Sequence, residues 1–200
     1  MHHTVHPRRM AAEITPAELF RLIDTDGNGS LNVAELKAAL DAGGLAYGLS
    51  TVQSLMRLFS GGQHSDTSLN LAQFTALHFW LTDILRRFTA ADASRRGVLS
   101  RQEARAALAG LLQSECQRQH SNAAHFALDE DAHAAFFDAA DPDQNGTLDA
   151  SEFVAAAATL KASFTVFRSF LQFDGDSAAA REGKITLDFP AFVYALAHIA

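Results

Sequence analysis

Apolar residues recur along this chain at the three- to four-residue spacing of an amphipathic helix, and short polar stretches separate the runs. Thr15, followed by Pro16 and Glu18, is typical of a helix start, because the hydroxyl caps the N–H of Glu18 and the carboxylate caps that of Thr15. Helix, polar loop and helix then repeat five times. The pattern predicts an all-α fold of five consecutive helix–loop–helix units over residues 15–200, preceded by a flexible tail of residues 1–14.

Two of the predicted helices are long enough to leave one unit and enter the next. The helix from Leu71 to Phe88 leads directly into the third loop, and the helix from Phe153 to about Phe173 leads into the fifth. Ser50 is predicted to cap the helix that enters the second unit, and the last helix is predicted over Phe189–Ile199. A polar insert, Gln113 to His125, is predicted to extend the helix of the third unit and then to form a surface loop.

Two of the polar loops, Asp24–Glu35 and Asp141–Glu152, match the EF-hand calcium loop. Each has oxygen side chains at positions 1, 3, 5 and 9, glycine at 6, an aliphatic residue at 8 and Glu at 12. Calcium is a hard ion that takes about six to eight oxygens, and a short loop supplies them by wrapping round the ion. Position 7 is expected to offer its carbonyl, position 9 to act through water, and position 12 to bind with both oxygens. The predicted calcium ligands are Asp24, Asp26, Asn28, Ser30, Asn32 and Glu35 in the first loop, and Asp141, Asp143, Asn145, Thr147, Asp149 and Glu152 in the fourth.

The second and third loops depart from this pattern. Gly62 and Gln73 stand at positions 1 and 12 of the second loop, which therefore lacks both anchoring carboxylates and is predicted to bind no ion. Arg96 stands at position 5 of the third loop, where its charge would face the ion, so that we predict an empty or weak site. The third loop keeps three doubtful ligands, Asp92, Ser94 and Glu103.

The fifth loop is stretched, because several residues too many separate Asp174 from Gly183, and Phe189 stands where the acid of position 12 belongs. A distorted site formed by Asp174, Asp176 and Asp188 is the less favoured alternative to an empty loop. Leu31 and Leu148, at position 8 of the two complete loops, are expected to join each loop to a neighbour through a short strand.

The composition narrows the possible partners and compartment. With 16 Lys and Arg against 23 Asp and Glu, the net charge is −7, which disfavours nucleic acid as a partner. The single cysteine, Cys116, excludes a disulfide within these residues and fits a reducing compartment, so we expect a cytoplasmic protein. We expect no transmembrane helix and no signal peptide, because no apolar run is long enough. His2 follows Met1, whereas N-myristoylation requires glycine there.

Two further groups of residues could have a chemical role, but a structural interpretation is favoured for both. Cys116 and His120 are four residues apart, as a nucleophile and its base on one helix face would be, but a polar insert that contains both residues is the favoured interpretation. We therefore predict that the chain is not an enzyme. His2, His3 and His6 could bind copper or nickel, although a solvated tail is favoured.

The five units, with long helices shared between the second and third and between the fourth and fifth, resemble the penta-EF-hand family. Phe74–Phe88 running into Asp92 is similar to the family's shared helix, and Gly183–Phe192 is similar to its fifth hand. The first loop is more similar to the apoptosis-linked and peflin branch than to sorcin. The resemblance implies that the unpaired fifth hand joins its counterpart in a second molecule, which gives a homodimer or a heterodimer. It also implies a calcium-driven adaptor that exposes an apolar groove, binds partner segments that are often Pro-rich, and in some members moves to membranes.

Three functions are compatible with these features. A calcium sensor and adaptor predicts that calcium increases the binding of an apolar dye and changes the fluorescence of Trp80. A regulatory small subunit of a larger calcium-dependent enzyme predicts a heteromer that persists under chelation. A passive buffer predicts calcium binding with neither change. We favour the sensor and adaptor.

Overall fold

The computed structural model describes residues 14–61, 68–119, 126, 128–174 and 188–197. The regular elements in these residues are helices, apart from two short strands that pair with each other. The elements in chain order are α1 (Pro16–Ile23), α2 (Val33–Ala42), α3 (Leu49–Ser60), α4 (Leu71–Ala91), β1 (Val98–Ser100), α5 (Arg101–Arg118), α6 (Glu130–Ala140), β2 (Thr147–Asp149), α7 (Ala150–Asp174) and α8 (Phe189–Ala197).

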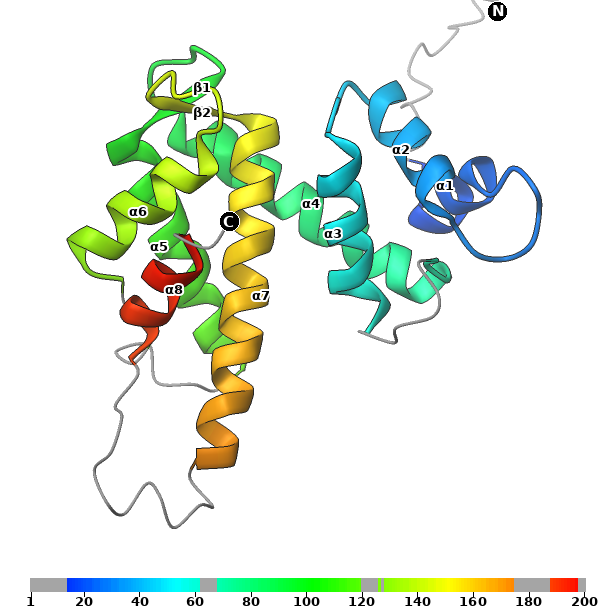
Figure 1. The fold of residues 1–200 in the computed structure, drawn as a ribbon. Helices are drawn as coiled ribbons and strands as arrows, with labels where there is room; N and C mark the ends of the chain where they lie inside the picture. The colour runs from blue at the N-terminus through cyan, green and yellow to red at the C-terminus, as the bar shows by residue number, and fades with distance from the viewer. Residues whose placement is uncertain (1–13, 62–67, 120–125, 127, 175–187, 198–200) are drawn as a thin grey trace, which may run out of the picture.

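Helix α4 joins the two halves of the molecule. In Figure 1, α1, α2 and α3 lie on one side and α5 to α8 on the other, and α4 runs from one group to the other. It packs against α1 and α3 in the first half and against α5 and α7 in the second. The predicted helix shared by the second and third units is thus confirmed. It continues past the predicted end at Phe88 to Ala91, because the N–H of Asp92 still donates to the carbonyl of Phe88 at 3.0 Å.

Helix α7 is the second shared helix, and it holds α8 through aromatic side chains. The ring of Phe126 lies 4.4 Å from that of Phe164 and 5.2 Å from that of Phe189, measured between centroids. Phe167 lies 5.3 Å from Phe189. All four rings are buried, so that they form the core between the end of α7 and the start of α8. Among the described helices, none has both the length and the apolar character that a membrane span requires.

The loops pair as the position-8 leucines predict. Leu31 of the first loop forms a two-way backbone bridge with Leu69 of the second, with N···O distances of 2.8 and 2.9 Å. Leu99 and Leu148 lie opposite each other where β1 pairs antiparallel with β2. All four side chains are fully buried. The first and second hands are therefore one unit, and the third and fourth hands another.

Two predicted helix starts are wrong. Ser50 does not cap α3, which begins at Leu49 after Gly48, because the carbonyl of Gly48 already accepts the N–H of Val52 at 3.2 Å. The exiting helix of the fourth unit starts at Ala150, before the predicted Phe153, since β2 ends at Asp149. The helix α5 runs to Arg118, which confirms that the polar insert begins as a helix extension.

Candidate calcium-binding loops

The first, third and fourth loops share one backbone shape. Positions 4 and 6 of each are left-handed, with φ of 69° and 79° at Gly27 and Gly29, 53° and 76° at Arg95 and Gly97, and 55° and 77° at Gln144 and Gly146. Side chains other than glycine rarely adopt this conformation. Arg95 and Gln144 adopt it nonetheless, so the surrounding hydrogen bonds must impose the turn.

The carboxylate at position 1 supplies those hydrogen bonds in all three loops. Asp24 accepts the backbone N–H groups of Asn28 and Gly29 at 3.1 and 2.9 Å. Asp92 and Asp141 accept the corresponding N–H groups of positions 5 and 6 at distances between 2.7 and 3.1 Å. The backbone of each loop therefore wraps round the side chain of the aspartate at position 1. This turn brings the other oxygen ligands toward one point.

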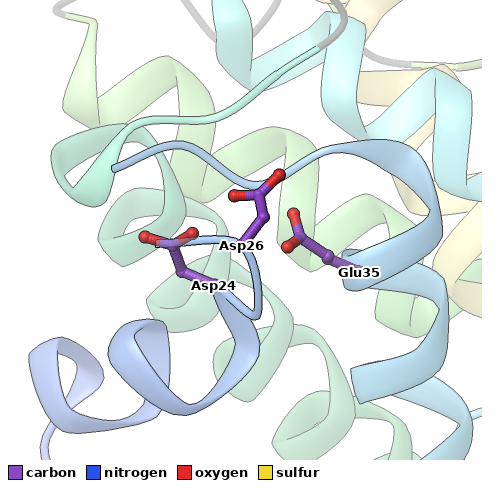
Figure 2. Close-up of side chains that lie close together, drawn as sticks. All are labelled: Asp24, Asp26 and Glu35. Atoms are coloured by element: carbon purple, nitrogen blue, oxygen red, sulfur yellow. The ribbon is translucent and has the colours of Figure 1, made fainter. Parts of the chain in front are cut away.

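The first loop gathers three carboxylates. Oxygens of Asp24, Asp26 and Glu35 lie within 4.8 Å of one another. Figure 2 shows the two aspartates on the loop and Glu35 reaching from α2 toward them. The side-chain oxygen of Asn28 accepts both the N–H and the hydroxyl of Ser30, at 2.8 and 2.7 Å, which fixes positions 5 and 7 relative to each other.

The fourth loop repeats this arrangement. Oxygens of Asp141, Asp143 and Glu152 also lie within 4.8 Å of one another. Asn145 donates from its amide to Asp143 at 2.8 Å, and its oxygen accepts the N–H and the hydroxyl of Thr147 at 2.8 and 2.6 Å. Position 5 is therefore linked to positions 3 and 7 as in the first loop, where the Asn28 amide donates to Asp26 at 2.9 Å.

The residues at positions 9 and 12 also start the exiting helix, a role that our sequence analysis missed. Asn32 accepts the N–H of Glu35 at 3.0 Å, and the Glu35 carboxylate accepts the N–H of Asn32 at 3.0 Å. Asp149 and Glu152 are linked in the same way at 2.8 and 2.9 Å. This is a capping box, and its S/T/D/N-x-x-E/Q signal was readable in the sequence. One pair of side chains thus fixes both the loop and the first turn of the helix.

Glu35 and Glu152 occupy equivalent positions but have different surroundings. The backbone N–H of Asn32, with the N–H and hydroxyl of Thr25, holds the pKa of Glu35 below its usual value. Partial burial raises the pKa of Glu152, and the carboxylates of Asp149, Asp143 and Asp141 add to this shift. Repulsion among carboxylates is therefore less compensated in the fourth loop, and a bound cation would relieve it.

The third loop has an arginine among its ligand positions. Asp92 is buried and accepts the hydroxyl of Ser94 at 3.1 Å, and Ser100 and Glu103 form the capping box. Arg96 donates from Nε to the Ser94 hydroxyl at 2.7 Å. The guanidinium thereby engages the position-3 oxygen. That the third site is empty or weak stays a prediction.

The second loop is closed by a direct hydrogen bond at position 12. The side-chain amide of Gln73 donates to the carbonyl of Ser60, at the end of α3, at 3.1 Å. The Gln73 oxygen also caps the N–H of Asn70 at 2.9 Å. A neutral amide thus ties the entering helix to the exiting helix. Positions 1–6 of this loop, and residues 175–187 of the fifth loop with Asp176, lie outside the described residues.

Cys116 lies buried in α5. Burial raises the pKa of its thiol, and the neighbouring Glu115 carboxylate adds to the shift. Both effects disfavour the thiolate that a nucleophile needs. Its possible partner His120, like His2, His3 and His6, lies outside the described residues.

The donor chemistry of the first and fourth loops fits calcium. Both clusters consist of carboxylates, supplemented by amide, hydroxyl and carbonyl oxygens, without a thiol or imidazole. Such oxygen-only sets select hard cations. Asp24, Asp26 and Glu35, and Asp141, Asp143 and Glu152, would hold the ion, which would supply the positive charge that these clusters lack. The ligand role of each residue remains a prediction.

Comparisons with known proteins agree with this geometry. A family model described as an EF-hand domain matches residues 17–45, and one described as an EF hand matches residues 134–156. These stretches contain the first and fourth loops. No curated protein sequence matches the chain. Among solved structures, a homologue of programmed cell death 6 protein from Leishmania major Friedlin is similar, with 26% identity and a TM-score of 0.58, over 92% of this chain and 93% of that one. The chain is therefore a calcium-binding EF-hand protein, and its similarity to this homologue supports a relationship to the penta-EF-hand family.

Proposed function

We propose that the chain is a calcium sensor and adaptor, in which the fourth loop controls an apolar groove that binds protein partners. One observation carries the proposal. Glu152, the last predicted ligand of the fourth loop, also lines a hollow of about 270 Å³ whose other walls include Phe136, Ala156 and Val193. The same side chain thus belongs to an ion-binding loop and to an apolar surface.

The hollow continues along α7. A second hollow of about 460 Å³ shares Thr51, Ala155, Thr159 and Ser163 with the first. We call the two together the α7 groove. Its sides come from α3 in the first half of the chain and from α6 and α8 in the second, while α7 supplies a floor of small side chains. Such a floor lets an extended peptide backbone approach closely, which fits the Pro-rich segments expected of a partner.

The carboxylates of the fourth loop offer a way for calcium binding to change the shape of the α7 groove. In the fourth loop three carboxylates converge; burial raises the pKa of Glu152, and the charges of Asp149, Asp143 and Asp141 add to the shift. Neutralisation of that cluster lets Glu152 close on Asp141 and Asp143. Because Pro142, Ser151 and Glu152 all line the groove, any such movement changes its width.

A dye titration tests the sensor role. Calcium should increase the fluorescence of an apolar dye on the wild-type protein, whereas Glu152→Gln should abolish most of the increase. Glu35→Gln should retain it, because Glu35 does not line the groove. If calorimetry detects calcium binding while the dye signal and Trp80 fluorescence stay constant, the protein is a passive buffer.

A matched pair of variants tests the groove. Ala155→Leu fills the segment that both hollows share, and Ala109→Leu adds the same side chain at an exposed position of α5. In an affinity capture from source cells, partners retained with calcium and released by chelator should be lost with the first variant and kept with the second. A partner retained under chelation would instead favour a regulatory subunit of a larger enzyme.

Assembly and location belong to the same proposal. We propose a homodimer or heterodimer through the fifth hand, a cytoplasmic protein with calcium-dependent membrane association, and no catalytic activity. Supporting features are the odd number of hands, the single buried cysteine and the absence of a thiolate-favouring environment at Cys116. Size-exclusion chromatography with light scattering, with and without calcium, measures the oligomer.

A further inference from the structure

A hollow of about 360 Å³ lies between α5 and α6, and it shares no residue with the α7 groove or with the first and fourth loops. We call it the α5–α6 hollow. Leu108, Ala134 and Phe137 give it apolar walls, and Arg101 and Arg105, one turn apart on α5, give it two guanidinium groups. Its volume is within the range of about 300–1,000 Å³ that is typical of small-molecule sites.

Both arginines are paired with acids of α6, but these pairs lie at the surface. Arg105 contacts Glu130 at 2.7 Å, and the Glu130 side chain is 82% exposed. Arg101 pairs with Asp138, and its guanidinium carbon lies 4.5 Å from the centre of the Phe137 ring. Exposed ion pairs contribute little to stability. An anionic ligand can therefore take the place of Glu130 beside Arg105 at little cost.

His133 of α6 adds a buried polar group without a partner to the α5–α6 hollow. It is 9% exposed and lines the hollow. No hydrogen bond joins its imidazole to another residue in the part of the chain that the structure describes. Burial lowers the pKa of His133, and the Arg105 guanidinium adds to the shift, so that at pH 7 the ring is neutral and carries one N–H donor. A buried donor without an acceptor is unfavourable, and an oxyanion in the hollow would supply the acceptor.

We propose that the α5–α6 hollow binds a phosphate monoester, whose phosphate contacts Arg101, Arg105 and His133 and whose organic group lies on the apolar walls. Two guanidinium groups match a dianion with three terminal oxygens, and their planar donors suit phosphate. A carboxylate carries only the charge that Glu130 already provides, so it has no advantage in displacing that side chain. The site is separate from the calcium loops and does not rest on the proposed function.

Calorimetry on the full chain with phenyl phosphate tests the site, in a chelator that prevents precipitation of calcium phosphate. We expect a dissociation constant of about 10⁻³ M or below. Arg105→Gln should weaken binding about tenfold or more, because it removes a charge-assisted hydrogen bond. Arg57→Gln removes the same charge from an exposed position of α3 outside the hollow and should leave the affinity unchanged. Glu130→Gln should tighten binding about two- to fivefold, because it removes the competing carboxylate.

His133 provides a second arm. His133→Leu should weaken binding about three- to tenfold, whereas His133→Gln keeps an N–H donor and should retain most of the affinity. Inorganic phosphate should bind more weakly than phenyl phosphate, because it makes no contact with the apolar walls.

Several outcomes would overturn the inference. They are no binding of phenyl phosphate at about 10⁻² M, equal affinities of Arg105→Gln and Arg57→Gln, weaker binding by Glu130→Gln, and equal losses in the two His133 variants. Arg57, Arg105 and Glu130 are exposed, so their variants should fold and keep the test decisive. All these affinities are measured in chelator, so they are independent of the calcium-dependent dye response and partner capture that test the proposed function.

Discussion

The guanidinium of Arg96 holds the hydroxyl of Ser94 at 2.7 Å across the third loop. The backbone there has the same left-handed turns as the first and fourth loops, and Asp92 makes the same N–H contacts. The third loop therefore keeps the EF-hand conformation while presenting a cation where a ligand belongs. The position-1 aspartate and the capping box at positions 9 and 12 hold this loop through hydrogen bonds of its own.

Replacement of that arginine should restore a weak third site. In Arg96→Asn, position 5 regains an amide oxygen and the loop loses the opposing charge, so calorimetry should detect an additional calcium-binding event. We expect a dissociation constant of about 10⁻⁴ to 10⁻³ M, because the loop has only two carboxylates. Arg95→Asn removes the same charge at position 4, which Asn tolerates in the left-handed conformation. A third event in this control, or none in Arg96→Asn, would contradict the prediction.

The two complete loops should each lose their site when the glutamate at position 12 becomes an amide. Glu35→Gln and Glu152→Gln keep a side chain that can cap the helix, so the loops should still fold. Each variant should lack one calorimetric binding event, because position 12 supplies two of the oxygens. Glu103→Gln, the matched change in the third loop, should retain both events. Unchanged stoichiometry in either of the first two variants would remove that loop from the assignment.

His133 should make the stability of the protein fall in acid. Burial in α6 lowers its pKa from the usual 6.5, and the Arg105 guanidinium adds to the shift, while Glu130 and Asp129 oppose it. The unfolded chain therefore binds the proton more readily than the folded chain. Stability contributed by the neutral ring is present above pH 6.5 and is lost as pH falls toward the folded pKa.

Urea unfolding of wild type and His133→Leu measures this effect. Between pH 7 and about pH 5, the free energy of unfolding of wild type should fall relative to that of the variant, which has no group to protonate there. The difference between the two proteins is the quantity to compare, because other groups titrate in both. A constant difference across this range would show that His133 does not carry the dependence.

Most of the ligand positions of the two calcium sites could be predicted from the sequence, because the geometry of each site is local. The ligands of each loop lie within twelve consecutive residues, and position 1 shapes the turn through N–H groups four and five residues later. The helix starts at Thr15 and at the end of each loop follow from capping boxes of equally short range. The start of α3 was not predictable in this way, because Gly48 provides only a backbone carbonyl there and follows the buried Tyr47.

The sequence by itself determined that this chain is a series of EF-hands, which of its loops carry complete oxygen sets, and which are damaged. Only the tertiary structure decided what those loops touch. It placed Glu152 in the wall of the α7 groove and Gln73 against the end of α3. The spacing of the calcium ligands is a property of neighbouring residues and can therefore be read from the sequence. Burial and the contacts between the two halves depend on how segments far apart in the chain pack, and no local sequence pattern determines that packing.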